Sequence, residues 1–401
     1  MKNLYDKYRR IINLTSMKLV RGYTDRINWD TPLLSLRGQK GVGKSTIMLQ
    51  YIKQHYDIAD RSVLYCTCDS AYFASHSLLT LADRFYKNGG KHLFLDEIHK
   101  YEGWSSEIKE IYDSYPDLRV VISGSSLLKL MQGDADLSRR CINYDIQGLS
   151  FREFLNFYHG IDIRKYDLDE ILTNPWELCE QINQACRPIA LFHEYLQFGY
   201  YPYYLKLKNK IDYYTAIEQV VNYVIDEELT RICRVEMSNT RKIKALINVL
   251  AAQQPFEVDI KSFATQSALQ RNTILEYLNH MHNANLLHLL YADLLNVKKM
   301  QKPDKIYLDN SNMLYAMSPE QVKIGTVRET FAVNQLAFNH KVEYAKDHGD
   351  FRVDNKYVFE IGGAGKDFHQ IAGIPNSFVL ADDTEFPDGN KLPLWIIGFL
   401  Y

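Results

Sequence analysis

Short runs of apolar residues, many of them β-branched, alternate with helical patterns between Leu33 and about Ile146. The pattern predicts helices between strands at 33–37, 62–67, 92–95, 118–123 and 141–146. The runs are nearly continuous in apolar residues, which is typical of strands buried on both faces of a parallel sheet. Residues 1–150 are therefore expected to form an α/β domain in which helices cover a parallel sheet.

The pattern changes twice after Leu149. Long amphipathic stretches predict a helical region over 151–238. Three helical segments, followed by two apolar strands around Ala292 to Lys305, predict a winged-helix domain over 239–310. The remaining residues, 311–401, predict a closing α/β domain with a helix near 326–338 and strands at 342–346, 351–353, 357–361, 377–380 and 394–400.

The composition, with 46% hydrophobic and 24% charged residues, is that of a globular protein. Its 401 residues are more than one hydrophobic core usually organises, so we expect several domains. The 47 Lys and Arg residues against 49 Asp and Glu residues leave a net charge of -2, so any contact with nucleic acid must be local. The apolar run from Leu392 to Tyr401 is about half the length of a membrane span, and we expect no membrane partner. The six cysteines follow no disulfide or metal-site spacing and the N-terminus has no signal-peptide pattern, which favours a cytoplasmic location.

The segment from Gly38 to Ser45, GQKGVGKS, matches the phosphate-binding loop pattern GxxxxGK[ST] between a predicted strand and a predicted helix. Glycines let the backbone wrap around phosphates, and the following helix adds its positive end. Lys44 is expected to reach the β- and γ-phosphates, and Ser45 to take one coordination position of Mg²⁺. The expected nucleotide-binding residues are Gly38, Gln39, Lys40, Gly41, Val42, Gly43, Lys44, Ser45 and Thr46. The alternative is a glycine turn that merely joins a strand to a helix.

Two acidic residues end the apolar strand at 92–95, which we expect to neighbour the loop strand in the same sheet. Asp96 is the candidate for holding the water shell of Mg²⁺, and Glu97 for polarising the water that attacks the γ-phosphate. Ser123, at the end of another strand, is a candidate sensor of the γ-phosphate, although a serine in an ordinary turn fits the same string. Arg139 or Arg140 could stabilise the transition state, or both could be solvated surface residues.

GTP is the alternative nucleotide, because Asn209 to Asp212 spells NKxD, a pattern that reads guanine. The tetrapeptide lies in the helical region instead of at the end of a sheet strand. The acidic site also has no DxxG pattern, so the parts favour ATP.

The strings LDEIHKYEGWSSEIKEIYD, VVISGSS and LSFREFL closely resemble a large family of bacterial P-loop ATPases related to the AAA superfamily. The resemblance implies that Lys44, Ser45, Asp96, Glu97 and Ser123 carry the nucleotide chemistry. It also implies a winged helix and a C-terminal domain similar to PD-(D/E)xK nucleases, and we expect the helical region before them to form a helical lid. The family often has Gly-Arg where this chain has Ser138-Arg139-Arg140, so the resemblance does not assign the arginine.

The two C-terminal modules have weaker signals. The winged-helix segment carries nine Lys and Arg residues against six acids, and Arg271, Asn272, Glu276 and Asn279 lie on the polar side of its third helix. Lys298, Lys299, Lys302 and Lys305 could form a wing that touches DNA phosphates, or the module could be a docking domain. In the last domain, Asp350 and Glu360 match nuclease ligands, and Glu329 could complete an acidic cluster. Gly362 stands where such enzymes have lysine, so we expect an inactive domain unless Lys366 reaches back.

These features predict an AAA-type ATPase that uses ATP and Mg²⁺, releases ADP, and couples nucleotide state to domain movement. The alternative is a nucleotide-gated module that binds DNA or a protein partner and hydrolyses ATP slowly. A protein partner or a homo-oligomer is compatible with either function.

Overall fold

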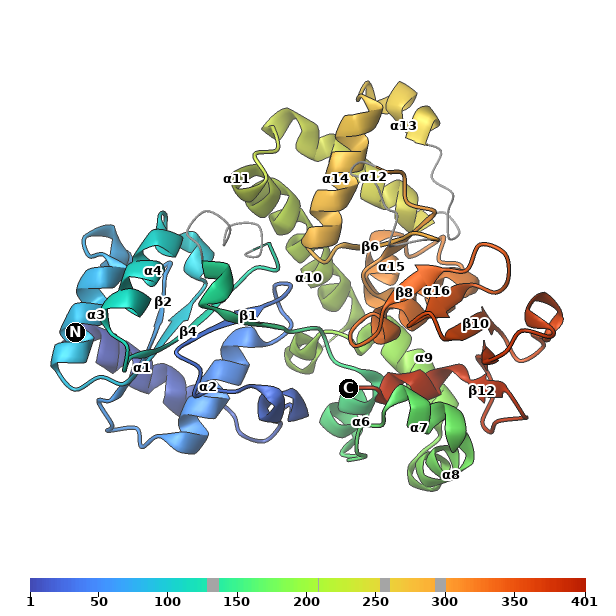
Figure 1. Ribbon diagram of the computed structural model, residues 1–401, viewed down its shortest axis with the longest axis horizontal. Helices are drawn as coiled ribbons and strands as arrows, with labels where there is room; N and C mark the ends of the chain where they lie inside the picture. The colour runs from blue at the N-terminus through green and yellow to red at the C-terminus, as the bar shows by residue number, and fades with distance from the viewer. Residues whose placement is uncertain (128–136, 208, 253–259, 293–300) are drawn as a thin grey trace. The chain divides into compact units, whose positions relative to one another are not determined.

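The computed structural model describes residues 1–127, 137–207, 209–252, 260–292 and 301–401 (Figure 1). The chain divides into two compact units, Met1–Gln147 and Gly148–Tyr401. The first boundary lies three residues before the expected one at 150. The expected divisions at 238 and 310 fall inside the second unit and stay predictions.

The first unit is built on a five-stranded parallel sheet in the order β2-β3-β4-β1-β5. Its strands are β1 (Leu33–Arg37), β2 (Val63–Thr67), β3 (His92–Asp96), β4 (Arg119–Gly124) and β5 (Ile142–Asp145). The apolar runs predict all five within about a residue, because β1 to β4 are almost entirely buried. The edge strand β5 differs from the expectation of full burial, since Ile142 is exposed.

The strand order corrects one expectation about the acidic strand. We expected β3 to neighbour the loop strand β1, but β4 pairs with both and lies between them. Local apolar runs cannot set strand order, because every buried parallel strand has the same pattern. The consequence is that Ser123, at the end of β4, stands between the loop and the acids that end β3.

Helices of the first unit pack as two pairs, α1 with α2 and α3 with α4 (Figure 1). The helices are α1 (Lys2–Leu14), α2 (Lys44–His55), α3 (Leu78–Lys87) and α4 (Trp104–Ser114). Helix α1 buries Leu4, Tyr8 and Ile12, whose spacing of four places them on one face. Short 3-10 turns cover Gly22–Arg26, Ala71–Ala74, Ile98–Lys100 and Leu137–Arg139.

The second unit begins with the helical region that the amphipathic stretches predict. Ser150 and Glu153 form a capping box that starts α6, which fixes the beginning of this region. The helices are α6 (Phe151–His159), α7 (Leu168–Thr173), α8 (Pro175–Ala185), α9 (Pro188–Phe198), α10 (Lys210–Tyr223) and α11 (Thr230–Ile232), with a 3-10 turn at Pro202–Lys206 and a π-helical segment at Val224–Leu229.

Three helices and an antiparallel strand pair follow, which is the order that a winged helix requires. They are α12 (Met237–Ala252), α13 (Ile260–Ser267), α14 (Arg271–Asn283), β6 (Leu287–Leu290) and β7 (Lys305–Leu308). The strands lie further apart along the chain than the expected Ala292 to Lys305, and residues 293–300 between them lie outside the description. The winged-helix assignment therefore stays a prediction.

A second five-stranded sheet, of order β12-β11-β10-β9-β8, closes the chain. Strands β10, β11 and β12 run parallel, whereas β9 pairs antiparallel with β10 and with β8. The elements are α15 (Ser311–Met317), α16 (Ile324–Leu336), β8 (Val342–Tyr344), β9 (Phe351–Val353), β10 (Tyr357–Gly362), a 3-10 turn at His369–Ile371, β11 (Ser377–Ala381) and β12 (Lys391–Pro393).

The expected terminal strand at 394–400 is wrong, because Leu394–Phe399 forms a 3-10 helix. All six residues of this helix are buried. A short run that is apolar on every side has no period, so its sequence cannot separate a buried strand from a buried helix.

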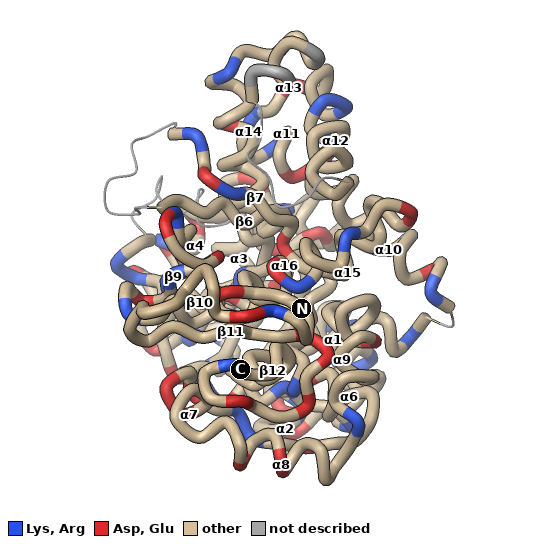
Figure 2. The backbone as a smooth tube through the Cα atoms, turned by 90° about the vertical axis from the view of Figure 1, so that its right-hand side faces the viewer, with Lys and Arg blue, Asp and Glu red and all other residues tan. Residues whose placement is uncertain are grey.

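Charges of both signs are interspersed along the described parts of both units, as Figure 2 shows. This agrees with the near-neutral composition. Within the described ranges, the structure has no helix that combines the length and apolar character needed to span a bilayer.

Candidate nucleotide-binding site

The segment Gly38 to Ser45 connects β1 to α2 and needs glycine at three positions. Gly41 and Gly43 have φ angles of 95° and 103°, a region that other residues rarely adopt. A Cβ atom on Gly38 would lie 2.2 Å from the carbonyl oxygen of Ile146. The loop geometry therefore explains the glycine pattern before any ligand is considered.

Lys44 is buried at the first turn of α2 and folds back over this loop. Its Nζ donates to the carbonyl oxygens of Gly38 at 2.8 Å and Gln39 at 3.0 Å. An ammonium group has three donors and no acceptor, so this position holds a positive charge inside the curve of the loop. Ser45 is half-buried and Thr46 is exposed on the next positions of the helix.

Asp96 is held by hydroxyl groups from two strands. Tyr65 on β2 donates to its Oδ2 at 2.5 Å, and Ser123 on β4 donates to its Oδ1. Burial, followed by the charge of Asp96, raises the pKa of Tyr65, so the phenol keeps its proton and remains a donor. Asp96 and Ser123 were expected at this edge, whereas the sequence gives no motif for Tyr65.

Glu97 has an unusual backbone conformation, with φ of 53° and ψ of 41°. Its N–H group donates to Asp96 Oδ1 at 3.1 Å and to Ser123 Oγ at 3.3 Å. A non-glycine residue in this region is held there by its surroundings, and such residues cluster at functional sites. The structure thus brings Asp96, Glu97 and Ser123 into one hydrogen-bonded cluster.

The carboxyl group of Glu97 lies in a poorly solvated place near the loop lysine. Burial raises its pKa above the usual range, while the positive charge of Lys44 opposes that shift. Because β1 and β3 are parallel strands of one sheet, the loop that follows β1 and the Glu97 residue that follows β3 lie at the same edge. A carboxylate with a raised pKa is a better proton acceptor, which suits a residue that polarises water.

Arg21 is a buried residue beside the loop that the sequence analysis missed. Its Nη1 donates to the carbonyl oxygen of Val42 at 3.2 Å and to that of Gln147 at 2.6 Å. An arginine outside any motif carries no signal of this role. The contacts tie the middle of the loop to the last residue of the first unit.

The two candidate arginines have different surroundings. Arg140 pairs with Asp113 on α4 at 3.0 Å, so its charge is already engaged there. Arg139 is exposed. The segment 128–136 that precedes them lies outside the described residues, and the assignment of an arginine to phosphate stays a prediction.

The NKxD pattern has a structural role in the second unit. Asn209 caps α10, because its Oδ1 accepts the N–H of Asp212 at 2.8 Å and its Nδ2 donates to the Asp212 carboxylate. Asparagine at an N-cap followed by an acid in the first turn is a common helix start. The pattern is therefore accounted for without a guanine base.

The expected acidic cluster forms in the second unit. Asp350 accepts the N–H of Ile361 at 2.8 Å, which places it beside β10, the strand that carries buried Glu360. Lys366 reaches back and forms an ion pair with Glu360. Lys366 therefore brings its charge to the Glu360 carboxylate, which is the exception that the expectation of an inactive domain left open.

Glu329 on α16 joins this cluster as expected. Lys305 Nζ lies 3.7 Å from both Glu329 Oε2 and Asp350 Oδ1, and Tyr307 donates to Glu329 at 2.7 Å. Burial, followed by the Asp350 charge, raises the pKa of Glu329 to about 7. Lys305 thus faces two carboxylates, and its expected contact with DNA stays a prediction.

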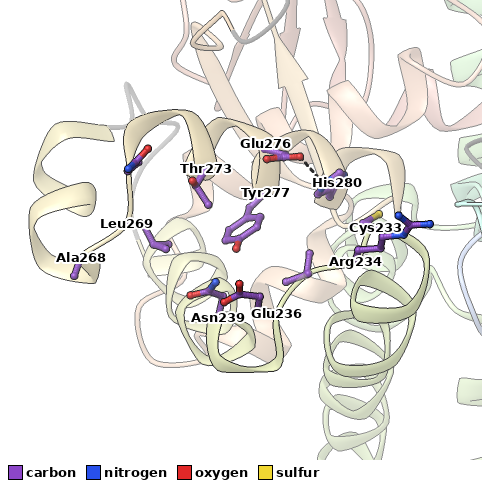
Figure 3. A pocket seen from close by; sticks show the side chains of 12 residues that line it. Cys233, Arg234, Glu236, Asn239, Ala268, Leu269, Thr273, Glu276, Tyr277 and His280 are labelled. Carbon is purple, nitrogen blue, oxygen red and sulfur yellow. Dashed lines mark ion pairs between the residues drawn. The ribbon is translucent and has the colours of Figure 1, made fainter.

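A cavity of about 460 Å³ lies against α14, the expected recognition helix (Figure 3). Glu236 and Glu276 contribute carboxylates to its wall, and Arg234 contributes one guanidinium group. Glu276 also pairs with His280 at 3.7 Å. This balance of charge does not favour a phosphate backbone on this face.

The remaining residues that were expected to contact DNA differ in their exposure to solvent. Arg271 and Asn272 are exposed, whereas the amide of Asn279 donates to the Leu275 carbonyl oxygen. Lys302 is half-buried. Lys298 and Lys299 lie outside the described residues, so contact with DNA stays a prediction.

Comparison with known proteins bears on the first unit most directly. Residues 30–155 match a family described as an AAA domain. Most of the first unit is therefore similar to an AAA domain. This agrees with the P-loop NTPase fold of the parallel sheet and with the expected ATPase resemblance at the level of the domain. Residues 189–323 match a domain of unknown function, DUF8612.

The relatives of the chain are distant. Two uncharacterized proteins of Methanocaldococcus jannaschii are 25% and 24% identical, over 68% and 83% of this chain and 60% and 73% of their own lengths. The chain therefore spans less than two thirds of the first of them. A third relative, an uncharacterized protein of Haemophilus influenzae, is 23% identical over 63% of this chain and 60% of its own length.

Among solved structures, the Aeropyrum pernix ORC1 protein in complex with DNA is similar at a TM-score of 0.30 and 11% identity. The match covers 79% of this chain and 92% of that one.

Proposed function

We propose that the protein is a Mg²⁺-dependent ATPase whose nucleotide state is coupled to movement of the second unit. The observation that carries the proposal is the strained Glu97, held by Asp96 and Ser123 at the sheet edge and facing the charge of Lys44. A P-loop alone would suit simple nucleotide binding. A partly buried carboxylate on a backbone that is held beside the loop suits activation of a water molecule.

Each residue has a distinct task in this proposal. The loop amides and Lys44 bind the phosphates and place the γ-phosphate near the sheet edge. Glu97 orients the attacking water and takes its proton, while Ser123 fixes the Glu97 backbone and Asp96. Because phosphoryl transfer needs mainly positioning and charge stabilisation, these fixed groups account for most of the chemistry the chain supplies.

The residues at this edge fit Mg²⁺, which prefers oxygen ligands and keeps several waters. Ser45 and Asp96 would hold it, and when bound it neutralises charge on the phosphates. Asp96 already accepts hydrogen bonds from Tyr65, Ser123 and the Glu97 N–H. A carboxylate has about four acceptor positions, so contact through a metal-bound water fits this arrangement.

Phosphate release by the purified full chain tests the proposed reaction. We expect hydrolysis of ATP with Mg²⁺, little hydrolysis of GTP, and loss of activity when the metal is chelated, with recovery after Mg²⁺ is added back. Release that matches a protein-free blank, or that continues in chelator, would contradict the proposal.

The Lys366 ion pair favours a second candidate function, metal-dependent cleavage of a phosphodiester. Glu329 and Asp350 flank Lys305, and Glu360 pairs with Lys366, so three carboxylate groups with hard oxygen atoms and two cations lie in this part of the second unit. A lysine near such carboxylates stabilises an attacking hydroxide and the charge of the transition state. The position of Lys366 beside Glu360 therefore favours a cleavage site, although the usual lysine position is occupied by Gly362.

Incubation of DNA with the full chain and Mn²⁺ or Mg²⁺ tests the second candidate. We expect cleavage by wild type, none by the Asp350→Ala/Glu360→Ala variant, and a loss of about tenfold or more for Lys366→Ala. Lys356→Ala, which changes an exposed lysine in the turn between β9 and β10, serves as the control. Intact DNA in the wild-type reaction would mean that the lysines only neutralise buried carboxylates.

A further inference from the structure

His99 is a buried histidine two residues beyond Glu97, in the short 3-10 turn Ile98–Lys100. The backbone N–H of Ser125 donates to its Nδ1 at 3.4 Å. Its Nε2 lies 3.5 Å from Glu97 Oε2. One imidazole ring therefore contacts both the segment that ends β4 and the carboxylate assigned to water activation.

The hydrogen bond from Ser125 determines which nitrogen of a neutral ring carries the proton. Nδ1 must offer its lone pair to the Ser125 N–H, so the ring proton is on Nε2. Nε2 is the nitrogen that faces Glu97. The nitrogen that carries the proton of a neutral ring thus lies 3.5 Å from Glu97 Oε2, and no positive charge is required for it to direct the carboxylate.

The same part of β4 also holds the backbone of Glu97. Ser123 Oγ accepts the Glu97 N–H at 3.3 Å, and Ser123 donates to Asp96. Glu97 is therefore held at its backbone by Ser123 and approached at its carboxylate by a ring that Ser125 orients. Glu97 has a left-handed backbone, a conformation that a non-glycine residue keeps only when its surroundings hold it there.

We propose that His99 is a positioning residue that couples the Glu97 carboxylate to the conformation of the Ser123–Ser125 segment. When this segment is in place, Ser125 orients the ring and the ring directs the carboxylate. When the segment shifts, Glu97 loses its direction and hydrolysis slows while nucleotide stays bound. This proposal rests on the proposed ATPase function, and it adds a residue that regulates the direction of the Glu97 carboxylate in the same site.

Two substitutions separate positioning from simple packing. His99→Phe keeps a ring of similar size but has no N–H donor, whereas His99→Gln keeps a donor close to the position of Nε2. We expect His99→Phe to lower kcat for ATP about tenfold or more with KM and the nucleotide Kd within twofold of wild type. We expect His99→Gln to recover most of that loss.

A double-mutant cycle tests whether His99 acts through Glu97. Adding His99→Phe to Glu97→Gln should cause no further loss of kcat, because the carboxylate that the ring directs is then absent. His99→Asn, which places no donor at the Nε2 position, should behave like His99→Phe and provides the test if the phenylalanine variant does not fold.

Three results would overturn the inference. They are a wild-type kcat in a folded His99→Phe or His99→Asn variant, equal losses in the phenylalanine and glutamine variants, and fully additive losses in the cycle. In each of these cases wild type still hydrolyses ATP, so the proposed function survives. A wild type that releases no phosphate from ATP would remove the proposed function and this inference together.

Discussion

Replacing Glu97 by glutamine is expected to leave ATP binding intact and to lower turnover about a hundredfold or more. The amide has nearly the same shape but cannot accept a proton from water. The backbone contacts of Glu97 with Asp96 and Ser123 do not involve the substituted group, so the site should keep its structure. The variant should therefore accumulate as an ATP-bound protein.

Steady-state phosphate release and equilibrium binding of labelled ATP measure the two effects separately. Glu102→Gln removes the same charge from an exposed residue five positions later and is the matched control. Wild-type turnover by Glu97→Gln would show that another group activates the water. A large loss of binding would show that Glu97 contributes to affinity instead.

Replacing Lys44 by alanine should abolish ATP binding within the accessible concentration range. The side chain is the one buried ammonium group that we place among the loop carbonyls, and its removal leaves the γ-phosphate without this charge. The loss should exceed that of any exposed lysine, because a cation held in a poorly solvated loop interacts more strongly with phosphate.

Binding of ATP by calorimetry, with the unfolding temperature measured beside it, checks this outcome. Lys87→Ala is the control, since Lys87 is an exposed lysine paired with Asp83 on α3. Binding by Lys44→Ala within a few fold of wild type would contradict the P-loop assignment. A variant that unfolds at the wild-type temperature but does not bind would support it.

Local signals in the sequence were sufficient for the elements of the first unit. The strands from β1 to β4 are buried on both faces, so their apolar runs mark them directly. The glycines of the loop pattern were also predictable, because Gly41 and Gly43 have positive φ angles that other residues rarely adopt. The strand at 394–400 failed because a run buried on all sides has no period to read.

Contacts between distant segments could not be predicted in the same way. Tyr65, Arg21 and His99 approach the candidate site from β2, the N-terminal segment and the turn after β3. Their roles depend on strand order and side-chain direction, which no spacing along the chain encodes. Lys366 could be predicted only in part. The sequence shows a lysine close enough to reach back to Glu360, but the conformation of the turn after Gly362 determines that it forms the ion pair.

Gly38 and Arg21 together fasten the phosphate loop to residues 146 and 147, where the first unit ends. Gly38 has no room for a side chain against the Ile146 carbonyl oxygen, and Arg21 bonds both Val42 and Gln147. The phosphate loop and residues 146 and 147 at the end of the first unit are therefore directly packed and hydrogen-bonded together. If a displacement of residues 146 and 147 changes the affinity of the loop for phosphate, thermodynamic reciprocity requires that bound phosphate resist that displacement by the same factor.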